Sequence, residues 1–390
     1  MRSLDDTDRL LLTVIQREFP LLPRPYILLG RELGIPEGEA LRRTNSLRDA
    51  GPIRQISAIF NTRSLGYRST LAAFRIPPDR LETAAKIVSA HPGVSHNYER
   101  VHDYNLWFTI AVPPTSHLGL EKTVEVLARE AGASSTLLLP TIKTFKIGVK
   151  LDMTDNQGSE PAREGGAGTA SRDKSASASP FPLGPETWPL PTGPDGVPLP
   201  NAVDDLAGDE DFPPLDPHAS MPLPLTQEQV ELVRRLQEDI PRELEPFKPG
   251  AEAAGLAVDD YLREAAAFMR SRHMRRFAAV LHHREAGFVA NAMGVWAVPQ
   301  DKVDEIGAAM ASFRAVSHCY QRPTCPGWPY SLFTMVHAKS REECEQILGA
   351  IAEATGVADR GVLYSVKDFK KVRVRYFTPE IEEWEKPRLS

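Results

Sequence analysis

An internal repeat constrains the fold of this chain more than any other feature of its sequence. Four segments near the start of the chain reappear in its last third, in the same order and at nearly constant spacing. The aligned pairs are Ile53–Ala58 with Met274–Ala279, Arg63–Tyr67 with Arg284–Phe288, Val94–Arg100 with Val316–Arg322, and Leu106–Thr109 with Ser331–Thr334, the last after a three-residue insertion. Such agreement is hard to obtain by chance, so the sequence predicts two diverged copies of one module.

Each copy carries the same pattern of secondary structure. Short helical patterns come first, typical of a winged helix-turn-helix, and strands and helices follow in the β-α-β-β-α-β order of a ferredoxin-like fold. In the first copy we expect a helix around Leu10–Ile15, helices over 27–33, 37–49, 79–90 and 120–130, and strands over 53–60, 69–76, 94–100, 105–112 and 141–149. In the second copy we expect helices over 227–239, 258–271, 300–311 and 341–354, and strands over 290–298, 316–322, 330–338 and 370–377.

The expected fold class is therefore α+β, with the two modules pairing through their ferredoxin-like sheets as an internal pseudo-dimer. The first module is expected over 1–152, with its helix-turn-helix at 1–52 and its ferredoxin-like part at 53–152. The second is expected over 224–390, with corresponding parts at 224–273 and 274–378. Residues 153–223, rich in Pro, Gly, Ser, Ala and Asp, bury too little apolar surface to fold and are predicted to form a disordered linker.

Charge and cysteine content exclude some classes of protein. The formal net charge of -6 disfavours a protein whose main function is to bind nucleic acid, because such binding needs clustered positive charge. Three cysteines without paired C-x-x-C spacing suit a reducing compartment and give no zinc motif. Neither a signal peptide nor an apolar run of about 20 residues is visible, so we expect a cytoplasmic protein without a membrane span.

Several motifs resemble those of siroheme decarboxylase subunits. They are Met274–Arg284, Gly287–Phe288, Asn291–Trp296 and Trp328–Met335 in the second copy and His102–Phe108 in the first. The winged helix-turn-helix followed by a ferredoxin-like part is similar to Lrp/AsnC regulators, on whose scaffold this family is built. The resemblance covers both halves and omits the linker, like the fused NirD–NirL (AhbA–AhbB-type) form of two related subunits.

This resemblance implies a carboxy-lyase that removes CO2 without oxidation from the two acetate side chains, C12 and C18, of siroheme. The product is 12,18-didecarboxysiroheme, which feeds heme d1 or alternative heme b biosynthesis. It implies that no cofactor is required, because siroheme brings its own iron as part of the substrate. Siroheme and didecarboxysiroheme are the expected ligands, and the two halves of the chain are expected to pair with each other. A homodimer and contacts with related heme d1 pathway subunits are left open.

A flat, polyanionic tetrapyrrole needs an apolar slot with cations at its rim, and guanidinium groups bind carboxylates with fixed geometry. Arg275 and Arg276 are candidate catalytic residues, but neighbours in a strand point to opposite faces, and the sequence does not decide between them. Arg54 repeats Arg275, whereas Gln55 stands in place of Arg276. The other candidate substrate-binding residues are Arg54, Arg63, Arg284, Tyr104, Asn105, Trp107, Asn291, Trp296, Trp328 and Tyr330.

Histidines are the candidate proton donors, because an imidazole can protonate the carbon that loses CO2 near neutral pH. His282 and His283 have no counterpart in the first copy, and His102 has none in the second. This complementarity suits a composite site built from unlike halves. Alternatively, His283 or His102 is a ligand of the siroheme iron, while the protein itself has no metal site. His96 and His318 occur in both copies, which a shared structural role explains equally well.

Ordinary structural roles are the alternative to these assignments. Exposed arginines usually form weak surface ion pairs, and tryptophans usually belong to the core. Two other functions remain open: an Lrp/AsnC-type DNA-binding transcription regulator, and a heme-binding sensor without turnover. A regulator would read DNA with the helix over 37–49, whose Arg42, Arg43 and Arg48 are offset by Glu37, Glu39 and Asp49. The sequence also leaves open whether the chain has one active site or two.

Overall fold

The computed structural model describes residues 4–147, 224–281, 290–338 and 340–389. The predicted linker at 153–223 lies outside these residues, as do His282, His283 and Arg284. Within the described residues, no helix combines the length and apolar character needed to cross a membrane.

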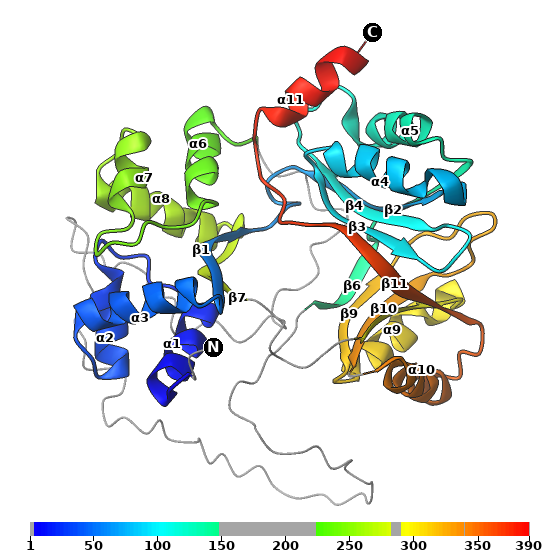
Figure 1. Ribbon diagram of the computed structural model, residues 1–390, viewed down its shortest axis with the longest axis horizontal. Helices are drawn as coiled ribbons and strands as arrows, with labels where there is room; N and C mark the ends of the chain where they lie inside the picture. The colour runs from blue at the N-terminus through cyan, green and yellow to red at the C-terminus, as the bar shows by residue number, and fades with distance from the viewer. Residues whose placement is uncertain (1–3, 148–223, 282–289, 339, 390) are drawn as a thin grey trace, which may run out of the picture. The chain divides into compact units, whose positions relative to one another are not determined.

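The first helix-turn-helix forms as predicted, from α1 (Asp6–Arg17), α2 (Pro25–Leu33) and α3 (Glu37–Asp49) (Figure 1). Asp5 caps α1 by accepting a hydrogen bond from the Asp8 amide at 2.7 Å. Gly34 ends α2 in the left-handed conformation, with φ of 66°, which glycine adopts without strain.

The second copy also has three helices, α6 (Gln227–Leu236), α7 (Lys248–Ala253) and α8 (Val258–Arg270). Only α6 and α8 were predicted, because the prolines between them suggested a distorted segment. Pro249 lies in the first turn of α7, where the missing amide costs no helical hydrogen bond, so a short helix forms there.

Strands β1 (Ile53–Phe60) and β7 (Met274–Leu281) pair with each other, antiparallel, in a two-stranded sheet of their own. The ferredoxin-like parts were expected over 53–152 and 274–378, but these two strands lie outside the nine-stranded sheet described below. They serve instead to join the two helix-turn-helix copies. The Asp239 carboxylate accepts hydrogen bonds from the Ile56 amide at 2.7 Å and from the buried Arg48 guanidinium at 3.0 Å. These contacts satisfy polar groups on α3 and β1.

The remaining strands form a nine-stranded sheet in the order β5-β2-β4-β3-β11-β8-β10-β9-β6. Its strands are β2 (Arg68–Arg75), β3 (Val94–Arg100), β4 (Leu106–Val112), β5 (Ser135–Leu139), β6 (Lys143–Ile147), β8 (Ala290–Trp296), β9 (Val316–Gln321), β10 (Leu332–Ala338) and β11 (Arg360–Lys371). Its helices are η1 (Pro78–Arg80), α4 (Leu81–Ala90) and α5 (Gly119–Ala131) in the first copy, and η4 (Gln300–Lys302), α9 (Val303–Ser312) and α10 (Arg341–Thr355) in the second.

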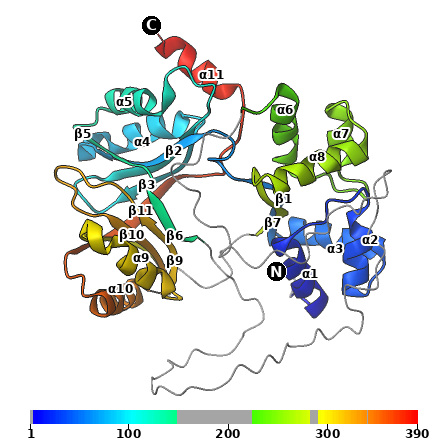
Figure 2. The same ribbon diagram turned by 180° about the vertical axis from the view of Figure 1, so that it is seen from behind.

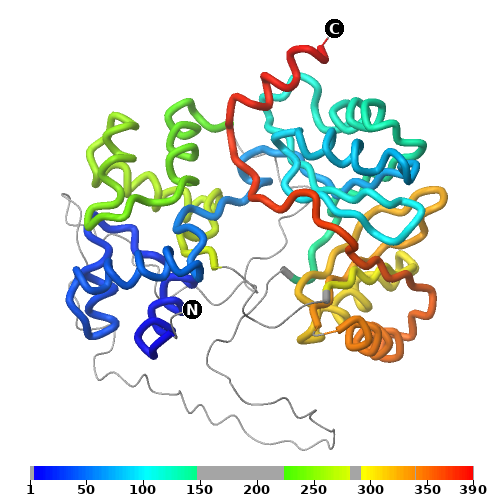
Figure 3. Tube along the Cα trace, viewed as in Figure 1, coloured from blue at the N-terminus to red at the C-terminus, as the bar shows by residue number. Residues whose placement is uncertain are grey.

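The two copies exchange their last strands. β11 pairs first with β8 of its own copy and then, from Ser365 onward, with β3 of the other copy. Reciprocally, β5 pairs with β2 while β6 crosses to β9. Figure 3 shows the red end of the second copy running into the cyan strands of the first. The predicted pairing of the two sheets is confirmed, and each sheet is completed by a strand of the other copy.

Two strand predictions need correction. β5 was not predicted, and the strand expected at 370–377 lies at Arg360–Lys371 instead. Residues 372–377 alternate like a strand but join no sheet. Their polar groups bond elsewhere: the Arg373 guanidinium donates to Ser57 Oγ at 3.1 Å, and the Tyr376 amide donates to Gln237 Oε1 at 2.7 Å.

Helices cover one face of the sheet, and a third apolar core lies on the other face. α4 and α5 lie over the first-copy strands, and α9 and α10 over those of the second (Figure 2). The opposite face carries side chains from both copies, which form one cluster: Ala73, Tyr104, Trp107, Leu137, Leu139, Met293, Val295, Trp328, Phe333 and Leu363. We call this the inner face. The expectation that the helix-free faces pack together is confirmed.

The C-terminal segment, with α11 (Glu380–Glu385) and η5 (Lys386–Arg388), packs on the first copy. The Trp384 and His91 rings meet edge to face at 4.4 Å. The buried Glu385 carboxylate accepts hydrogen bonds from the Ser116 hydroxyl and, at 2.9 Å, from the His117 amide. The end of the second copy therefore contributes to the structure of the first.

Candidate active site

The inner face carries two matching rows of polar side chains, one from each copy. The first row is His96, Tyr98 and Arg100, and the second is His318, Tyr320 and Arg322. In both rows the histidine and tyrosine rings lie 5.9 Å apart. Each guanidinium stacks over its tyrosine, at 5.6 Å in the first row and 5.2 Å in the second. The repeat seen in the sequence thus becomes a pair of equivalent rows.

Each row arginine donates a hydrogen bond to a strand of the other copy. Arg100 Nη1 donates to the Leu363 carbonyl of β11 at 2.7 Å, and Arg322 Nη1 donates to the equivalent Leu139 carbonyl of β5. Burial lowers the pKa of each guanidinium to about 10, so both remain cations at neutral pH. Within the described residues, neither makes an ion pair with a carboxylate. A fixed cation that is not held in an ion pair favours the approach of a carboxylate ligand.

Further cations on β1 and β7 act electrostatically on the rows. Burial raises the pKa of Tyr320, and the nearby charges of Arg322 and Arg275 oppose that rise. Burial lowers the pKa of Arg373, and the charges of Arg54 and Arg276 lower it further. Arg54 also contributes to the lowered pKa of His96, after burial and Lys371. The charge of Arg54 thus acts on the first row, and the charge of Arg275 acts on the second.

Arg275 and Arg276 differ in their surroundings, as expected for neighbours in a strand. Arg275 is exposed and its charge acts on Tyr320 and on Tyr376. Arg276 is half-buried, lies opposite Ile59 of β1, and acts on Arg373. These placements favour Arg275 as the cation that meets a ligand on the second row.

Histidines extend the second row into a hydrogen-bonded chain. His318 Nδ1 lies 2.9 Å from Ser317 Oγ, which lies 2.8 Å from His337 Nε2. His337 Nδ1 lies 2.6 Å from Asn291 Oδ1. Burial, and then His337, lowers the pKa of His318 to about 4. Of these four residues, only Asn291 was predicted as a site residue. The signal that was missed is the asymmetry of the repeat, which places His337 where the first copy has Ala111.

The loop between β3 and β4 brings several predicted residues together. The His102 ring stacks on Tyr104 at 6.1 Å and meets Trp328 edge-on at 5.5 Å. Partial burial lowers the pKa of His102. Tyr330 packs edge-on against Trp328 at 5.0 Å, so residues of both copies share this cluster. Among the residues that the structure describes, no three histidine, cysteine, aspartate or glutamate side chains are grouped so that they could hold a metal ion.

Other predicted residues have structural contacts. Trp107, on the inner face, donates to the Tyr104 carbonyl at 2.6 Å. Trp296 lies in the helix-side core, where it donates to Thr334 Oγ1 at 2.9 Å, so the structure does not bring it to the inner face. Asn105 bonds both backbone groups of Ile76 at the end of β2. Arg63 lies exposed in the turn after β1.

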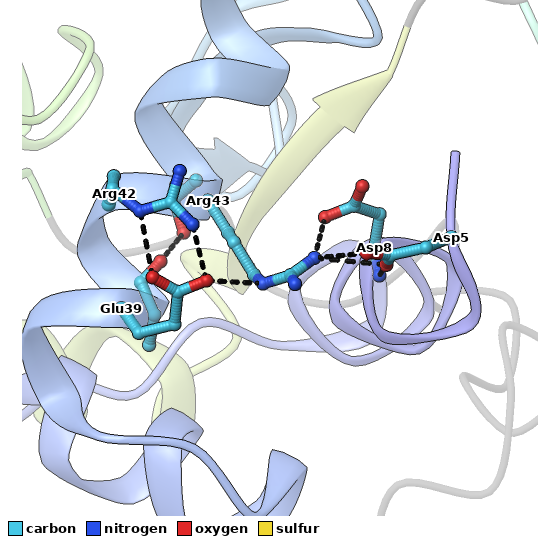
Figure 4. Close-up of polar contacts among 7 residues, drawn as sticks. Asp5, Asp8, Glu39, Arg42 and Arg43 are labelled. Carbon is cyan, nitrogen blue, oxygen red and sulfur yellow. Dashed lines mark hydrogen bonds and ion pairs between the residues drawn. The ribbon is translucent and has the colours of Figure 1, made fainter. Parts of the chain in front are cut away.

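The helix expected to read DNA has no free arginine on it. Arg42 pairs with Glu39, and Arg43 pairs with Asp5, Asp8 and Glu39 (Figure 4). The Arg48 side chain is buried against Asp239. A recognition helix needs cations available to phosphates, which internal pairing prevents here.

We therefore expect no salt-dependent binding of this protein to duplex DNA. The measurement is fluorescence anisotropy of labelled duplexes between roughly 50 and 200 mM salt, a range over which a DNA-binding protein loses most of its affinity. Affinity that falls steeply with salt would restore the regulator hypothesis.

Comparisons with known proteins decide the family. The family model described as "AsnC-like ligand binding domain" matches residues 64–146 and 285–370. The family model described as "Siroheme decarboxylase NirDL-like HTH domain" matches residues 8–54. A curated siroheme decarboxylase of Hydrogenobacter thermophilus is 35% identical over 380 residues, covering 97% of this chain and 98% of that protein. The chain belongs to the siroheme decarboxylase family.

Two further relatives agree with the architecture of the chain. The crystal structure of the siroheme decarboxylase NirDL in complex with an iron-uroporphyrin III analogue is similar, with a TM-score of 0.71, 31% identity and 98% of both chains covered. The siroheme decarboxylase beta subunit of Methanosarcina barkeri is 42% identical over 146 residues, which are 37% of this chain and 96% of that subunit. A separate subunit in that organism therefore corresponds to part of this fused member of the family.

Proposed function

We propose that this chain is a carboxy-lyase that removes CO2 without oxidation from the C12 and C18 acetate side chains of siroheme. The product is 12,18-didecarboxysiroheme, destined for heme d1 or alternative heme b synthesis in the cytoplasm. The observation that carries this proposal is the full-length match to siroheme decarboxylases, one of them solved with an iron tetrapyrrole analogue. The reaction needs no cofactor beyond the substrate itself.

Substrate binding follows from the cations and apolar surfaces described above. Arg54, Arg275 and Arg276 would pair with the carboxylates of the macrocycle. The charges of Arg54 and Arg275 act on the first and second row, respectively. Of the aromatic cluster around Trp328, the half-buried Tyr330 is the member that offers an apolar contact to a flat ligand. Trp328, Tyr104 and Trp107 are buried, so as proposed site residues they would support the ligand through packing.

The chemical step breaks the bond between the methylene and carboxyl carbons of an acetate. The electron pair remains on the methylene carbon while CO2 leaves, and a proton then converts that carbon into a methyl group. His282, His283 and His102 stay the proposed proton donors from the sequence, with iron ligation by His283 or His102 as the alternative role. Arg275 would orient the carboxylate that leaves.

An incubation in D2O tests both the reaction and which side chains of the tetrapyrrole lose CO2. Siroheme is incubated anaerobically with the protein in D2O, and the product is analysed by mass spectrometry and NMR. We expect the loss of two CO2 molecules and one deuterium in each new methyl group at C12 and C18. A changed absorption spectrum with an unchanged ligand mass would instead indicate a heme-binding sensor. Methyl groups at other positions would refute the assignment of the acetates.

The two halves pair within one chain, as the exchanged strands show. Further association into a homodimer, or with related heme d1 pathway subunits, remains part of the proposal. Size-exclusion chromatography with light scattering would distinguish a monomer from a dimer.

A further inference from the structure

A continuous line of hydrogen bonds crosses three neighbouring strands of the second copy. It runs from Asn291 on β8 through His337 on β10 to Ser317 and His318 on β9, with the distances given above. Asn291 and His337 are direct partners in the sheet. An irregular register between β9 and β10 adds Ser317 between Val316 and His318, which places Ser317 beside His337.

The donor and acceptor roles along this line are constrained by its chemistry. Asn291 Oδ1 only accepts, so His337 Nδ1 carries a hydrogen. When His337 is neutral, its Nε2 accepts from the Ser317 hydroxyl, which in turn accepts from His318 Nδ1. When His337 is an imidazolium, Nε2 donates to Ser317, and the Ser317 hydrogen moves to His318 Nδ1. His318 then carries its other hydrogen on Nε2.

We propose that Asn291, His337, Ser317 and His318 form a proton relay that supplies the methylene carbon of one of the two acetates after CO2 leaves, with His318 as the donor. His282, His283 and His102 remain the candidate donors for the other acetate. This inference rests on the proposed decarboxylation. One proton passes from His337 Nε2 to Ser317, the serine hydrogen passes to His318 Nδ1, and the hydrogen on His318 Nε2 passes to the carbon. His337 is left neutral and regains a proton from water between turnovers.

The surroundings of His318 suit this role. Its ring lies 5.9 Å from that of Tyr320, which is within the electrostatic reach of Arg275. Burial lowers the pKa of His318 to about 4, so its ring is neutral at physiological pH. His337 is only half-buried, and Asn291 is exposed. The line therefore joins His318 to residues that are in contact with solvent.

The first copy lacks this relay. Ser95 contacts His96 at 3.0 Å and Thr109 at 2.7 Å, and the line ends there. The register places Ser69 and Ala111 at the positions of Asn291 and His337. A second imidazole is therefore absent from that line, and the two equivalent rows have unequal proton supply.

His337→Ala tests the relay. We expect kcat for CO2 release to fall by about 100-fold, in the range of general acid catalysis, with little change in KM. Added imidazole should restore part of the activity, because it can occupy the vacated position and carry a proton. His337→Gln, which can hold hydrogen bonds but cannot carry a proton, should be as slow as His337→Ala. Ser69→Ala, at the first-copy position equivalent to Asn291, is the matched control and should keep wild-type kcat.

Unchanged kcat in His337→Ala would overturn the relay. So would full activity in His337→Gln together with no imidazole rescue of His337→Ala, because that combination indicates a purely structural histidine. If His337→Ala does not fold, the glutamine variant and Asn291→Ala, expected to be several-fold slower, decide the matter in the same way. Failure of the wild-type protein to release CO2 would instead refute the proposed function.

Discussion

Trp328→Ala is expected to lower the free energy of unfolding by about 3–5 kcal/mol, the usual cost of removing a large buried aromatic side chain. Trp328 is 1% exposed and lies at the centre of the inner-face cluster. Its ring meets Trp107 of the other copy at 5.4 Å and Tyr330 at 5.0 Å. The cavity left behind would therefore weaken the packing of one copy against the other. Urea unfolding of both proteins measures the difference.

Trp328→Phe serves as the matched control, because it keeps an aromatic ring in the cluster. We expect it to lose roughly half as much stability as the alanine variant, or less. A loss below about 1 kcal/mol for Trp328→Ala would mean that the inner face is not packed as described.

Arg275→Ala is expected to lower kcat/KM for siroheme by about 10- to 100-fold, the equivalent of one charged hydrogen bond of roughly 1.5–3 kcal/mol. The free energy of unfolding should change little, because the side chain is exposed and its backbone remains in β7. Steady-state CO2 release under anaerobic conditions gives the first quantity, and urea unfolding gives the second.

Arg270→Ala removes an equally exposed arginine from the end of α8 and is the control for loss of general positive charge. It should keep wild-type kcat/KM. Equal losses in both variants would point to a nonspecific effect of charge, and full activity in Arg275→Ala would remove this residue from the site even if the function is right.

Much of the fold could be predicted because it depends on local patterns and on the repeat. The helices of the first copy end where Gly34 and the Gly51-Pro52 pair predict. The pairing partners of strands could not be predicted in this way, since alternation shows which face is buried but not which edge is adjacent. β1, β6 and β11 therefore found partners in the other copy that the sequence does not reveal.

The alignment of the two copies also needed the structure. Leu106 pairs with Glu99, and Leu332 pairs with Gln321, the residues at equivalent places in β3 and β9. Leu106 therefore corresponds to Leu332, and the insertion before β10 has four residues, not three. A shift of one residue moves every side chain to the other face, which is why the sequence alignment did not reveal His337.

The candidate site was only partly accessible from the sequence. Arg54 and Arg275 were found through the repeat and the family motifs, and the structure places their charges beside the two rows. Trp296 was included for its residue type, but its ring faces the helices. Arg373 and Tyr376 were missed because their segment was expected to be part of a sheet. Their contacts with β1 and α6 arise from the tertiary fold alone.

Decarboxylation of siroheme by the paired copies is the activity on which all the other predictions about catalysis depend. The most direct measurement is an anaerobic incubation of purified protein with an equal amount of siroheme, followed over time by mass spectrometry. The account predicts that the substrate mass disappears through an intermediate lacking one CO2 and ends at a product lacking two. Siroheme that binds and keeps its full mass, or that does not bind at all, would contradict the account.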